Sequence, residues 1–331
     1  MNKMKALFIC GSPNQTKMIY QIARHLPQFD AYFTPYYGEG FLRLLQRVGM
    51  LDFTVMGGNF LKQTLRYLEA HGAAFDYEGR KGPYELVVTC SDLVVPNNVL
   101  GSKLVLVQEG MTDPETLMFY LVKKLRLPRW LAFTSTTGLS DAYDIFCVAS
   151  QGYKELFMRK GVKEEKIRVT GIPNFDDCPR FLENDFPYRD YVLVATSDRR
   201  ETYKYENRPR FIQKANQIAN GRALIFKFHP NENAERARRE VERYSPGARC
   251  FADGNTDHMI ANCCALVTRF SSVAYVALAL GKELHSDMAV EELRRLMPIQ
   301  NGGRSAANIA RECLRLCQTE VAPCDYLPAL S

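Results

Sequence analysis

The chain has 331 residues, of which 46% are hydrophobic and 24% charged. That length allows two domains with separate cores, and the composition excludes a disordered or fibrous chain. The net charge of +6 at pH 7 is compatible with anionic ligands or a membrane surface. It is far from the charge of a nucleic-acid-binding tail, so no nucleic-acid partner is expected.

The ten cysteines do not suggest a disulfide framework, because most of them lie in apolar runs such as LFIC, IFCVAS and ANCCALV. No CxxC pair is present, which argues against a structural zinc site. The N-terminus leads directly into a predicted strand rather than a signal peptide. No apolar run reaches the roughly 18 residues that a membrane-spanning helix needs. We therefore expect a reduced, cytoplasmic protein, with peripheral association at the inner face of the membrane as an open alternative.

Short apolar runs alternate with helical stretches along the whole chain. Strands are predicted at 5–10, 85–90, 103–108, 144–150, 166–171, 191–196, 223–229, 248–252, 265–270 and 282–287. Helices are predicted at 14–26, 40–48, 57–71, 114–125, 151–160, 207–220, 231–244, 255–262, 272–280, 289–296 and 305–318. Several strand candidates are unbroken apolar runs, which are typical of parallel strands covered on both faces. The alternation predicts an α/β fold with two doubly wound, Rossmann-like domains facing a cleft.

The predicted domain boundary is the stretch GIPNFDDCPRFLENDFPYRDY, which contains three prolines and has no helical period. It divides the chain into an acceptor-side domain, 1–172, a linker, 173–190, and a donor-binding domain, 191–331. Asp176 and Asp177 in the linker superficially suggest a metal site. We interpret them as a solvated turn, and no metal or other cofactor is expected.

Ligands of open α/β sheets bind beyond the carboxyl ends of the strands, so the loops that follow the strands carry the candidate sites. After the first strand, GSPNQT opens a helix, and Ser12, Asn14 and Gln15 could hold an anion at its free N–H groups. A plain capped turn explains the same residues equally well. The strand at 103–108 ends on Gln108 and is followed by Glu109, which would face the cleft. The alternative for Glu109 is a carboxylate that caps a helix or stabilises a hinge.

Three loops of the second half carry candidate phosphate ligands. In TSDRRET, Arg199 and Arg200 have guanidinium groups that suit phosphate oxygens, although a solvated charge run is the alternative. In FKFHPNE, Lys227 and His229 are expected on one strand face, with a helix opening at Asn231. His229 would end that strand at the predicted cleft, although a lone histidine is more often structural.

The third loop belongs to VTRFSSVAYVALALGKE, where Ser271 and Ser272 are expected to cap an apolar helix. Hydroxyls and free N–H groups at a helix N-terminus could hold a diphosphate, and simple capping is the alternative.

These motifs together resemble the second domain of GT-B-fold transferases. VTGIPNFD, FKFHPNE and TRFSSVAYVALALGK are similar to motifs of bacterial polysaccharide and teichoic-acid enzymes, including CDP-glycerol glycerophosphotransferases. UDP-N-acetylglucosamine 2-epimerases are a more distant likeness. The resemblance covers mainly 165–285, and it implies that His229, Ser271 and Ser272 hold the diphosphate of a nucleotide-activated donor. It also implies that Glu109 stands where the family has a histidine that acts as the acceptor base.

The sequence also departs from these families. Arg269 and Val276 occupy positions where the glycerophosphotransferase pattern has aspartates, and Tyr275 lies near the place of the ribose-binding glutamate of the epimerases. Arg269 would add positive charge near the phosphates. The departures weaken the assignment to either family but not the predicted fold.

Two stretches of the acceptor-side domain, 40–53 and 118–133, mix apolar and basic residues. The second contains Lys123, Lys124, Arg126 and Arg129 beside Trp130. A basic amphipathic helix with an interfacial aromatic residue can lie on an anionic membrane. The alternatives are a core helix with a solvated basic edge and a homodimer interface.

The sequence therefore predicts a metal-independent glycosyltransferase-type enzyme. It would transfer a sugar or polyol phosphate from a nucleotide-activated donor to a glycan or lipid-linked acceptor, in cell-envelope polysaccharide synthesis. A hydrolysing nucleotide-sugar 2-epimerase and a non-catalytic nucleotide-binding scaffold remain as alternatives. A Rossmann dehydrogenase is disfavoured because no glycine fingerprint follows the first strand.

Overall fold

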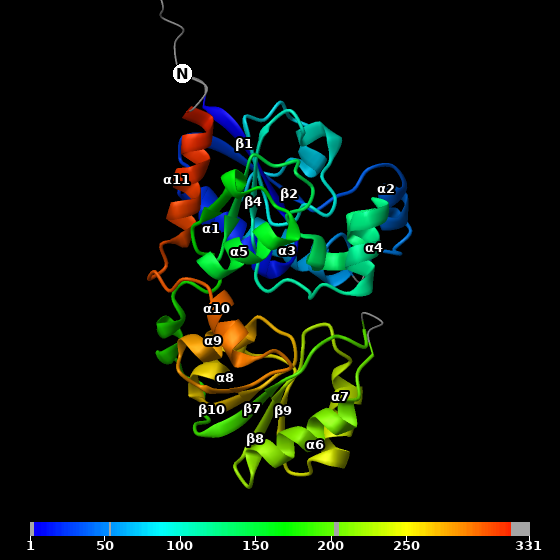
Figure 1. Ribbon diagram of the computed structural model, residues 1–331, viewed down its shortest axis with the longest axis vertical. Coiled ribbons are helices and arrows are strands. Elements are labelled where there is room, and N and C mark those ends of the chain that lie inside the picture. Colours follow the sequence, from blue (N-terminus) through cyan, green and yellow to red (C-terminus); the bar gives the residue numbers. More distant parts are fainter. Residues whose placement is uncertain (1–2, 53, 202–204, 319–331) are drawn as a thin grey trace, which may run out of the picture. The chain divides into compact units, whose positions relative to one another are not determined.

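The structure is a computed structural model that describes residues 3–52, 54–201 and 205–318. Phe53, Thr202 and Cys324, which belong to stretches discussed above, lie outside the described residues. The chain forms two compact α/β units, each built on its own parallel sheet (Figure 1). The alternation of strands and helices confirms the predicted α/β class.

The first unit has a six-stranded sheet with the order β2-β1-β3-β4-β5-β6, and every neighbouring pair is parallel. The strands are β1 Met4–Cys10, β2 Phe29–Pro35, β3 Leu86–Thr89, β4 Lys103–Val107, β5 Ile145–Val148 and β6 Ile167–Val169. The helices are α1 Pro13–Arg24, α2 Gly40–Arg47, α3 Gly58–Ala70, α4 Leu117–Leu125, α5 Gln151–Lys160 and α11 Ser305–Gln318. Consecutive residues are buried from Ala6 to Cys10 in β1, throughout β3 and from Leu104 to Val107 in β4, as expected for a parallel sheet covered on both faces.

The second unit has a five-stranded parallel sheet with the order β11-β10-β7-β8-β9. Its strands are β7 Tyr191–Ala195, β8 Leu224–Lys227, β9 Arg249–Phe251, β10 Cys263–Val267 and β11 Glu283–His285. Its helices are α6 Arg208–Ala219, α7 Ala234–Tyr244, α8 Thr256–Asn262, α9 Val273–Ala279 and α10 Val290–Leu296. Ile212 of α6 and Val241 of α7 pack with Val194 and Phe226 in a core against one face of this sheet.

Every predicted strand and helix overlaps an element of the structure, but one strand was missed. This is β2, whose sequence FDAYFTP is interrupted by Asp30 and ends in a proline. It pairs with β1 along its whole length in the structure. This pairing, rather than an apolar run in its own sequence, defines it as a strand. The helix expected to open at Asn231 begins instead at Ala234, where the Asn233 side chain accepts a hydrogen bond from the backbone of Arg236.

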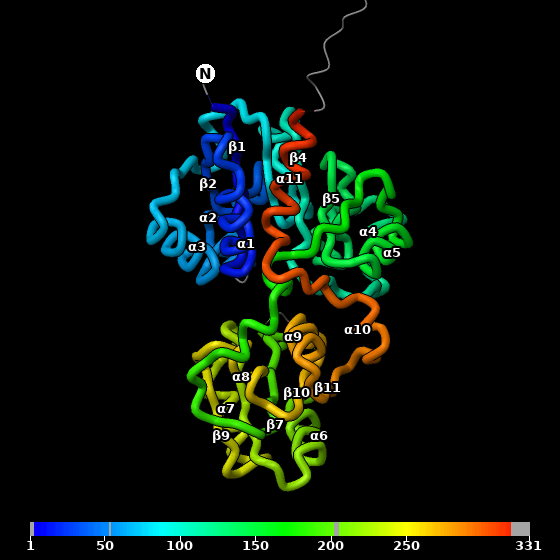
Figure 2. Tube along the Cα trace, turned by 90° about the vertical axis from the view of Figure 1, so that its left-hand side faces the viewer, coloured from blue at the N-terminus to red at the C-terminus, as the bar shows by residue number. Residues whose placement is uncertain are grey.

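The unit boundaries differ from the predicted domain boundaries. The first unit consists of the residues up to Val148, Phe157–Pro173 and the segment from Arg304 onward, and the second consists of Ala149–Leu156 and Asn174–Gly303. Helix α11, predicted in the second domain, contacts α1 and β4 of the first unit (Figure 2). It buries Ile309 and Cys313 completely, which explains why it belongs there.

The expected solvated turn at Asp176 and Asp177 is wrong for Asp176, which is only 1% exposed. Its carbonyl oxygen accepts hydrogen bonds from the backbone of Asn301 at 2.8 Å and of Gly302 at 3.0 Å. The predicted linker is therefore packed into the second unit at this point.

None of the helices in the described part of the chain has the length and apolarity needed to cross a bilayer.

Candidate functional site

Three residues from two predicted loops of the first unit meet at the carboxyl ends of β1 and β4. Glu109 follows β4 by two residues, and its Oε1 accepts a hydrogen bond from the Ser12 hydroxyl at 2.8 Å. Its Oε2 accepts one from the Gln15 side-chain amide at 2.6 Å. Both carboxylate oxygens are thus held by residues of the α1 start. Asn14 is exposed on the first turn of α1, outside this cluster.

Helix α1 begins with a reciprocal cap that positions these two donors. The Ser12 hydroxyl accepts from the Gln15 backbone N–H at 3.2 Å, and the Gln15 side-chain oxygen accepts from the Ser12 N–H at 3.3 Å. A Cβ at Gly11 would lie 1.8 Å from that side-chain oxygen, so glycine is needed for the close approach. The anion expected at this helix N-terminus is therefore supplied by the protein itself, as the Glu109 carboxylate.

Two buried thiols adjoin the same cluster, but they are poor candidates for nucleophiles. Burial raises the pKa of Cys10, and burial together with the Glu109 carboxylate raises the pKa of Cys90. Both therefore stay protonated at neutral pH, while a nucleophilic cysteine has to ionise. Glu109 is left as the acid–base candidate of this cluster.

His229 lies just beyond the carboxyl end of β8 in the second unit, with a side chain that is 36% exposed. Its ring Nδ1 accepts a hydrogen bond from the Asn231 backbone N–H at 3.2 Å and lies 3.6 Å from Asp198 Oδ2. Lys227 and His229 were predicted to share one strand face. Strand β8 ends at Lys227, so His229 lies outside the strand and the two residues do not share a face. The Lys227 ammonium is buried, donates to the carbonyls of Phe228 and Ala252, and has a pKa lowered by burial.

The predicted phosphate-binding arginines are engaged with groups of the protein. Arg200 donates to both oxygens of Glu240, at 2.7 Å and 2.9 Å, so its guanidinium is not part of a solvated charge run. Arg199 Nε donates to the carbonyl of Tyr205 at 3.4 Å. Arg269 Nε donates to Asp287 at 2.8 Å. Arg200 would have to leave Glu240 before its paired N–H groups could bind a phosphate.

A buried ionic network beneath these residues was not predicted from the sequence. Arg208, at the start of α6, is 1% exposed and lies 2.6 Å from Glu232 Oε1 and 3.0 Å from Glu206 Oε2. The side chains of both glutamates are fully buried. Arg208 opens a helix after a polar stretch, so its sequence context predicts an exposed residue. Only its tertiary partners explain its burial.

Ser271 and Ser272 precede α9 as predicted, but they do not cap it with their hydroxyls. Ser272 is the N-cap residue and is itself helical, with φ −62° and ψ −16°, and its side chain makes no cap hydrogen bond. The first turn is closed by backbone bonds, from Ala274 to the Ser271 carbonyl at 3.1 Å and from Tyr275 to the Ser272 carbonyl at 3.0 Å. Both serines are partly exposed after β10, at the same sheet edge as His229.

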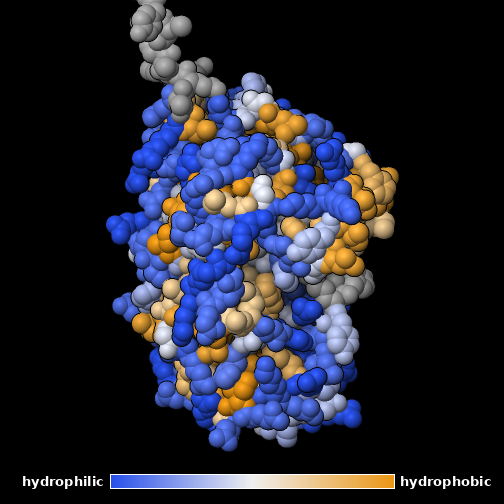
Figure 3. All heavy atoms as spheres, in the orientation of Figure 1, coloured by the Kyte–Doolittle hydropathy of each residue, from blue (hydrophilic) through white to orange (hydrophobic). Residues whose placement is uncertain are grey.

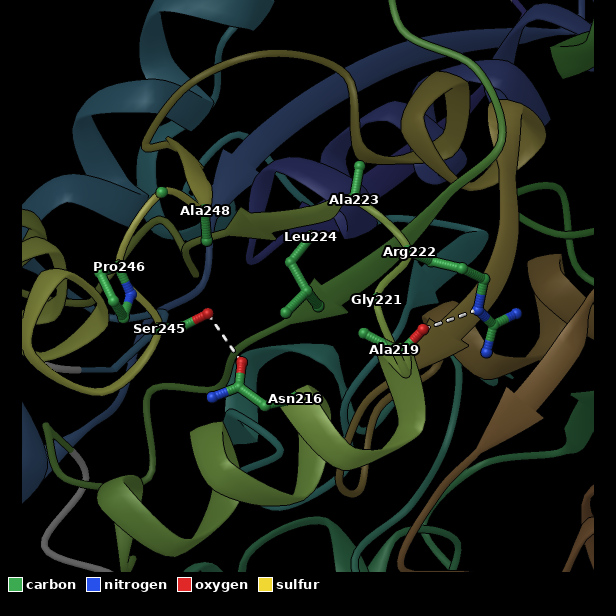
Figure 4. Close-up of a pocket in the computed structure, with 10 residues that line it drawn as sticks. Asn216, Ala219, Gly221, Arg222, Ala223, Leu224, Ser245, Pro246 and Ala248 are labelled. Atoms are coloured by element: carbon green, nitrogen blue, oxygen red, sulfur yellow. Dashed lines mark hydrogen bonds between the residues drawn. The ribbon is translucent and has the colours of Figure 1, made fainter.

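A separate pocket of about 430 Å³ lies at the opposite edge of the second sheet, beside the amino end of β8 (Figure 4). The Ser245 hydroxyl donates to the Asn216 side chain at 2.7 Å, and the Asn216 amide donates to the Tyr244 carbonyl at 2.7 Å. The Asn216 and Ser245 side chains therefore already have hydrogen-bond partners within the protein. Since ligands of such sheets bind at the carboxyl ends, the edge that carries His229 is the better candidate.

Metal ligation finds no support in the described ranges, where no group of three or more His, Cys, Asp or Glu side chains could hold an ion.

Comparison with solved structures defines the class of fold. A putative UDP-N-acetylglucosamine 2-epimerase from Listeria monocytogenes matches with 13% identity and a TM-score of 0.55, covering 97% of this chain and 92% of that one. The UDP-GlcNAc 2-epimerase from Neisseria meningitidis bound to UDP-GlcNAc matches with 12% identity and a TM-score of 0.54, covering 94% and 100%. A variant of the wall teichoic acid polymerase TagF, soaked with CDPG, matches with 10% identity and a TM-score of 0.54, covering 96% and 90%.

The chain therefore has an α/β GT-B-like fold of two units, which confirms the predicted fold and the resemblance to these two groups of proteins. No family model and no curated protein sequence matches the chain. Identities of 10% to 13% show the fold alone.

Proposed function

We propose that the protein transfers a sugar or polyol phosphate from a nucleotide-activated donor to a glycan or lipid-linked acceptor. The observation that carries this proposal is the Glu109 carboxylate, which Ser12 and Gln15 hold by both oxygens at the carboxyl edge of its sheet. Each carboxylate oxygen has two acceptor sites, so Glu109 can still accept a hydrogen bond from an acceptor hydroxyl, and then its proton, while Ser12 and Gln15 hold it in place. The solved neighbours support the donor class, since one is a complex with UDP-GlcNAc and another was soaked with CDPG.

In the proposed reaction, the acceptor hydroxyl gives its proton to Glu109 while its oxygen attacks the donor. For a sugar, the attacked atom is the anomeric carbon, and the nucleoside diphosphate leaves with the electron pair of the broken bond. For a polyol phosphate, the attacked atom is phosphorus and the leaving group is a nucleoside monophosphate. His229, Ser271 and Ser272 would donate hydrogen bonds to the phosphates, and Arg199, Arg200 and Arg269 would add positive charge.

Analysis of the nucleotide products tests this proposal and separates it from its alternatives. The protein is incubated with UDP-GlcNAc or CDP-glycerol, with and without a lipid-linked saccharide acceptor. Release of UDP or CMP that depends on the acceptor is expected for transfer. Release of UDP from UDP-GlcNAc without an acceptor would favour the hydrolysing epimerase instead. Binding without any release would favour the nucleotide-binding scaffold.

An exposed apolar surface supports a lipid-linked acceptor. No residue of helix α2 is fully buried, which argues against the core-helix alternative for this element. Phe41 of α2 is 67% exposed, and Leu117 of α4 is 76% exposed. Figure 3 shows apolar residues gathered at the side of the first unit where α4 lies in the same view of Figure 1. Lys123 and Lys124 lie in the last turn of α4, so cations flank the apolar residues.

We propose that this surface, which we call the α2–α4 surface, rests on an anionic membrane. Apolar side chains would enter the headgroup region while the lysines face anionic lipids. A homodimer interface is the competing use of the same surface.

A further inference from the structure

The main-chain position of His229 is fixed by a hydroxyl group that belongs to the neighbouring strand. The His229 N–H donates to the Thr196 Oγ1 at 3.1 Å, and Thr196 directly follows β7. The same hydroxyl lies 2.5 Å from Glu232 Oε2 and 3.3 Å from the Lys227 carbonyl oxygen, and we assign its single proton to the shorter contact, with Glu232. Thr196 is 6% exposed, so water does not compete for these bonds. Thr196 therefore connects the His229 backbone to a buried carboxylate.

Glu232 is itself held on its other oxygen. Arg208 approaches Glu232 Oε1 at 2.6 Å and Arg200 approaches it at 3.3 Å. The backbone N–H of Glu232 also donates to the His229 carbonyl at 2.9 Å, so the turn between these two residues is closed. A buried ion pair contributes little net stability compared with apolar residues of similar volume. The presence of such a network directly beyond β8 is therefore better explained by a positioning role than by stability.

The His229 ring has its own constraint, which determines where it can donate. The Asn231 backbone N–H points at Nδ1, so Nδ1 has to be the accepting nitrogen. A neutral imidazole with an accepting Nδ1 carries its proton on Nε2. The Asn231 side-chain amide donates to Asp198 Oδ2 at 3.1 Å, which keeps this carboxylate beside the same turn. The partly exposed ring thus presents an N–H donor through Nε2.

We propose that Thr196, anchored by Glu232, is a positioning residue that holds His229 so that its Nε2–H donates to a phosphate oxygen of a nucleoside diphosphate. This inference rests on the proposed function, because it takes the donor nucleotide as the ligand at His229. It adds a requirement that the resemblance does not contain, since Thr196 and Glu232 need not touch the ligand.

The test compares Thr196→Val with Thr196→Ser. Valine keeps the shape of threonine but removes the hydroxyl, whereas serine keeps the hydroxyl. Thr268→Val is the matched control, because Thr268 is a buried threonine at the end of β10 whose hydroxyl donates to the Ala195 carbonyl at 3.2 Å. Dissociation constants for UDP, CDP and GDP are measured by calorimetry, at a temperature where circular dichroism shows every variant folded.

We expect Thr196→Val to weaken binding of the preferred nucleotide about tenfold, which is the effect of losing one well-placed hydrogen bond. Thr196→Ser and Thr268→Val should bind within about twofold of the wild type. Equal binding by Thr196→Val and the wild type would overturn the positioning role. Absence of binding by the wild type to UDP, CDP and GDP alike would instead overturn the proposed function on which the inference rests.

The ring state provides a readout that does not depend on a ligand. Long-range ¹⁵N–¹H spectra distinguish the two neutral histidine tautomers, and loss of signals in His229→Gln assigns the resonances. We expect the Nε2–H tautomer for His229 in the wild type. An Nδ1–H tautomer would contradict the geometry whatever the affinity measurements give.

Discussion

At the scale of single residues, the first unit holds the proposed proton acceptor and the second unit holds the proposed hydrogen-bond donors to the phosphates. Glu109 is bound on both oxygens by Ser12 and Gln15, so its carboxylate has little freedom to rotate. His229 is fixed through its backbone and through Nδ1. Positioning of this kind lowers the cost of reaching a reactive geometry.

Replacing Glu109 by glutamine is expected to lower kcat by about 100-fold or more at saturating donor and acceptor, because the amide cannot take a proton. The dissociation constant for the nucleotide should not change, since the proposed donor ligands lie in the other unit. Glu69→Gln, on exposed α3, is the matched control and should keep wild-type turnover. Undiminished turnover in Glu109→Gln would rule out the base role.

The buried network makes a prediction about stability. Arg208→Ala leaves the carboxylates of Glu206 and Glu232 buried without their shared cation. The free energy of unfolding should fall by about 3–5 kcal/mol, as it does when one partner of a buried ion pair is removed. Urea unfolding measures the loss. Arg210→Ala, on the exposed side of the same helix, should change it by no more than about 0.5 kcal/mol. If the loss in Arg208→Ala were as small as the loss in Arg210→Ala, the network would be solvated rather than buried.

The sequence predicted some of these residues and not others, for a physical reason. Glu109 and His229 each follow an apolar strand by two residues, so the carboxyl-edge rule for parallel sheets places them at that edge without tertiary information. Thr196 and Arg208 contact partners that are distant in sequence, and the residues adjacent to them in the chain do not predict these contacts. The predicted capping by Ser271 and Ser272 did not occur because the backbone closes the first turn of α9 by itself.

At the scale of secondary-structure elements, the α2–α4 surface is the feature that internal packing does not explain. Phe41→Ser together with Leu44→Ser should weaken binding to phosphatidylglycerol vesicles about tenfold in sedimentation, because both side chains are more than half exposed. Binding should also weaken as salt is added, since the proposed contact sets the lysines in the last turn of α4 against anionic lipids.

Leu100→Ser is the matched control for this experiment, because Leu100 is 53% exposed but lies outside both helices. Equal vesicle binding by the double variant and the wild type would remove the membrane role. If light scattering showed a dimer that the double variant loses, the surface would be a homodimer interface instead.

A buried thiol in strand β5 is expected to make the stability of the protein depend on pH. Burial in β5 raises the pKa of Cys147 from 9.0 to about 12, so between these values the unfolded chain loses a proton that the folded chain keeps. Stability from this group is complete below pH 9 and is lost as the pH rises toward 12. The stability advantage of the wild type over Cys147→Ala should therefore shrink between pH 8 and pH 10 in urea unfolding under reducing conditions. A constant difference would contradict the assigned shift.

Most elements could be predicted because their apolar runs are unbroken and their lengths are ordinary. Strand β2 could not, since Asp30 and Pro35 interrupt its pattern and its pairing with β1 supplies the missing information. The start of α7 was misplaced because the turn at His229 delays it until Asn233 provides a cap.

At the scale of the whole molecule, two α/β units carry different parts of the proposed chemistry. Their boundaries were not predictable from composition, because α11 follows the second unit in sequence but packs on α1 and β4 of the first. Helix α11 packs on the first unit because its apolar face, which includes Ile309 and Cys313, is buried there. This packing depends on tertiary contacts. The GT-B-like fold, in contrast, followed from motifs within one half of the chain.

The most direct test of the central claim is thermal denaturation of the wild type and of His229→Ala with UDP, CDP, GDP, CMP and NAD. One nucleoside diphosphate should raise the melting temperature of the wild type, since a ligand at about 100 times its dissociation constant adds roughly 2.7 kcal/mol. The shift should disappear in His229→Ala. No shift with any nucleoside diphosphate, or a shift with NAD alone, would contradict donor binding at His229.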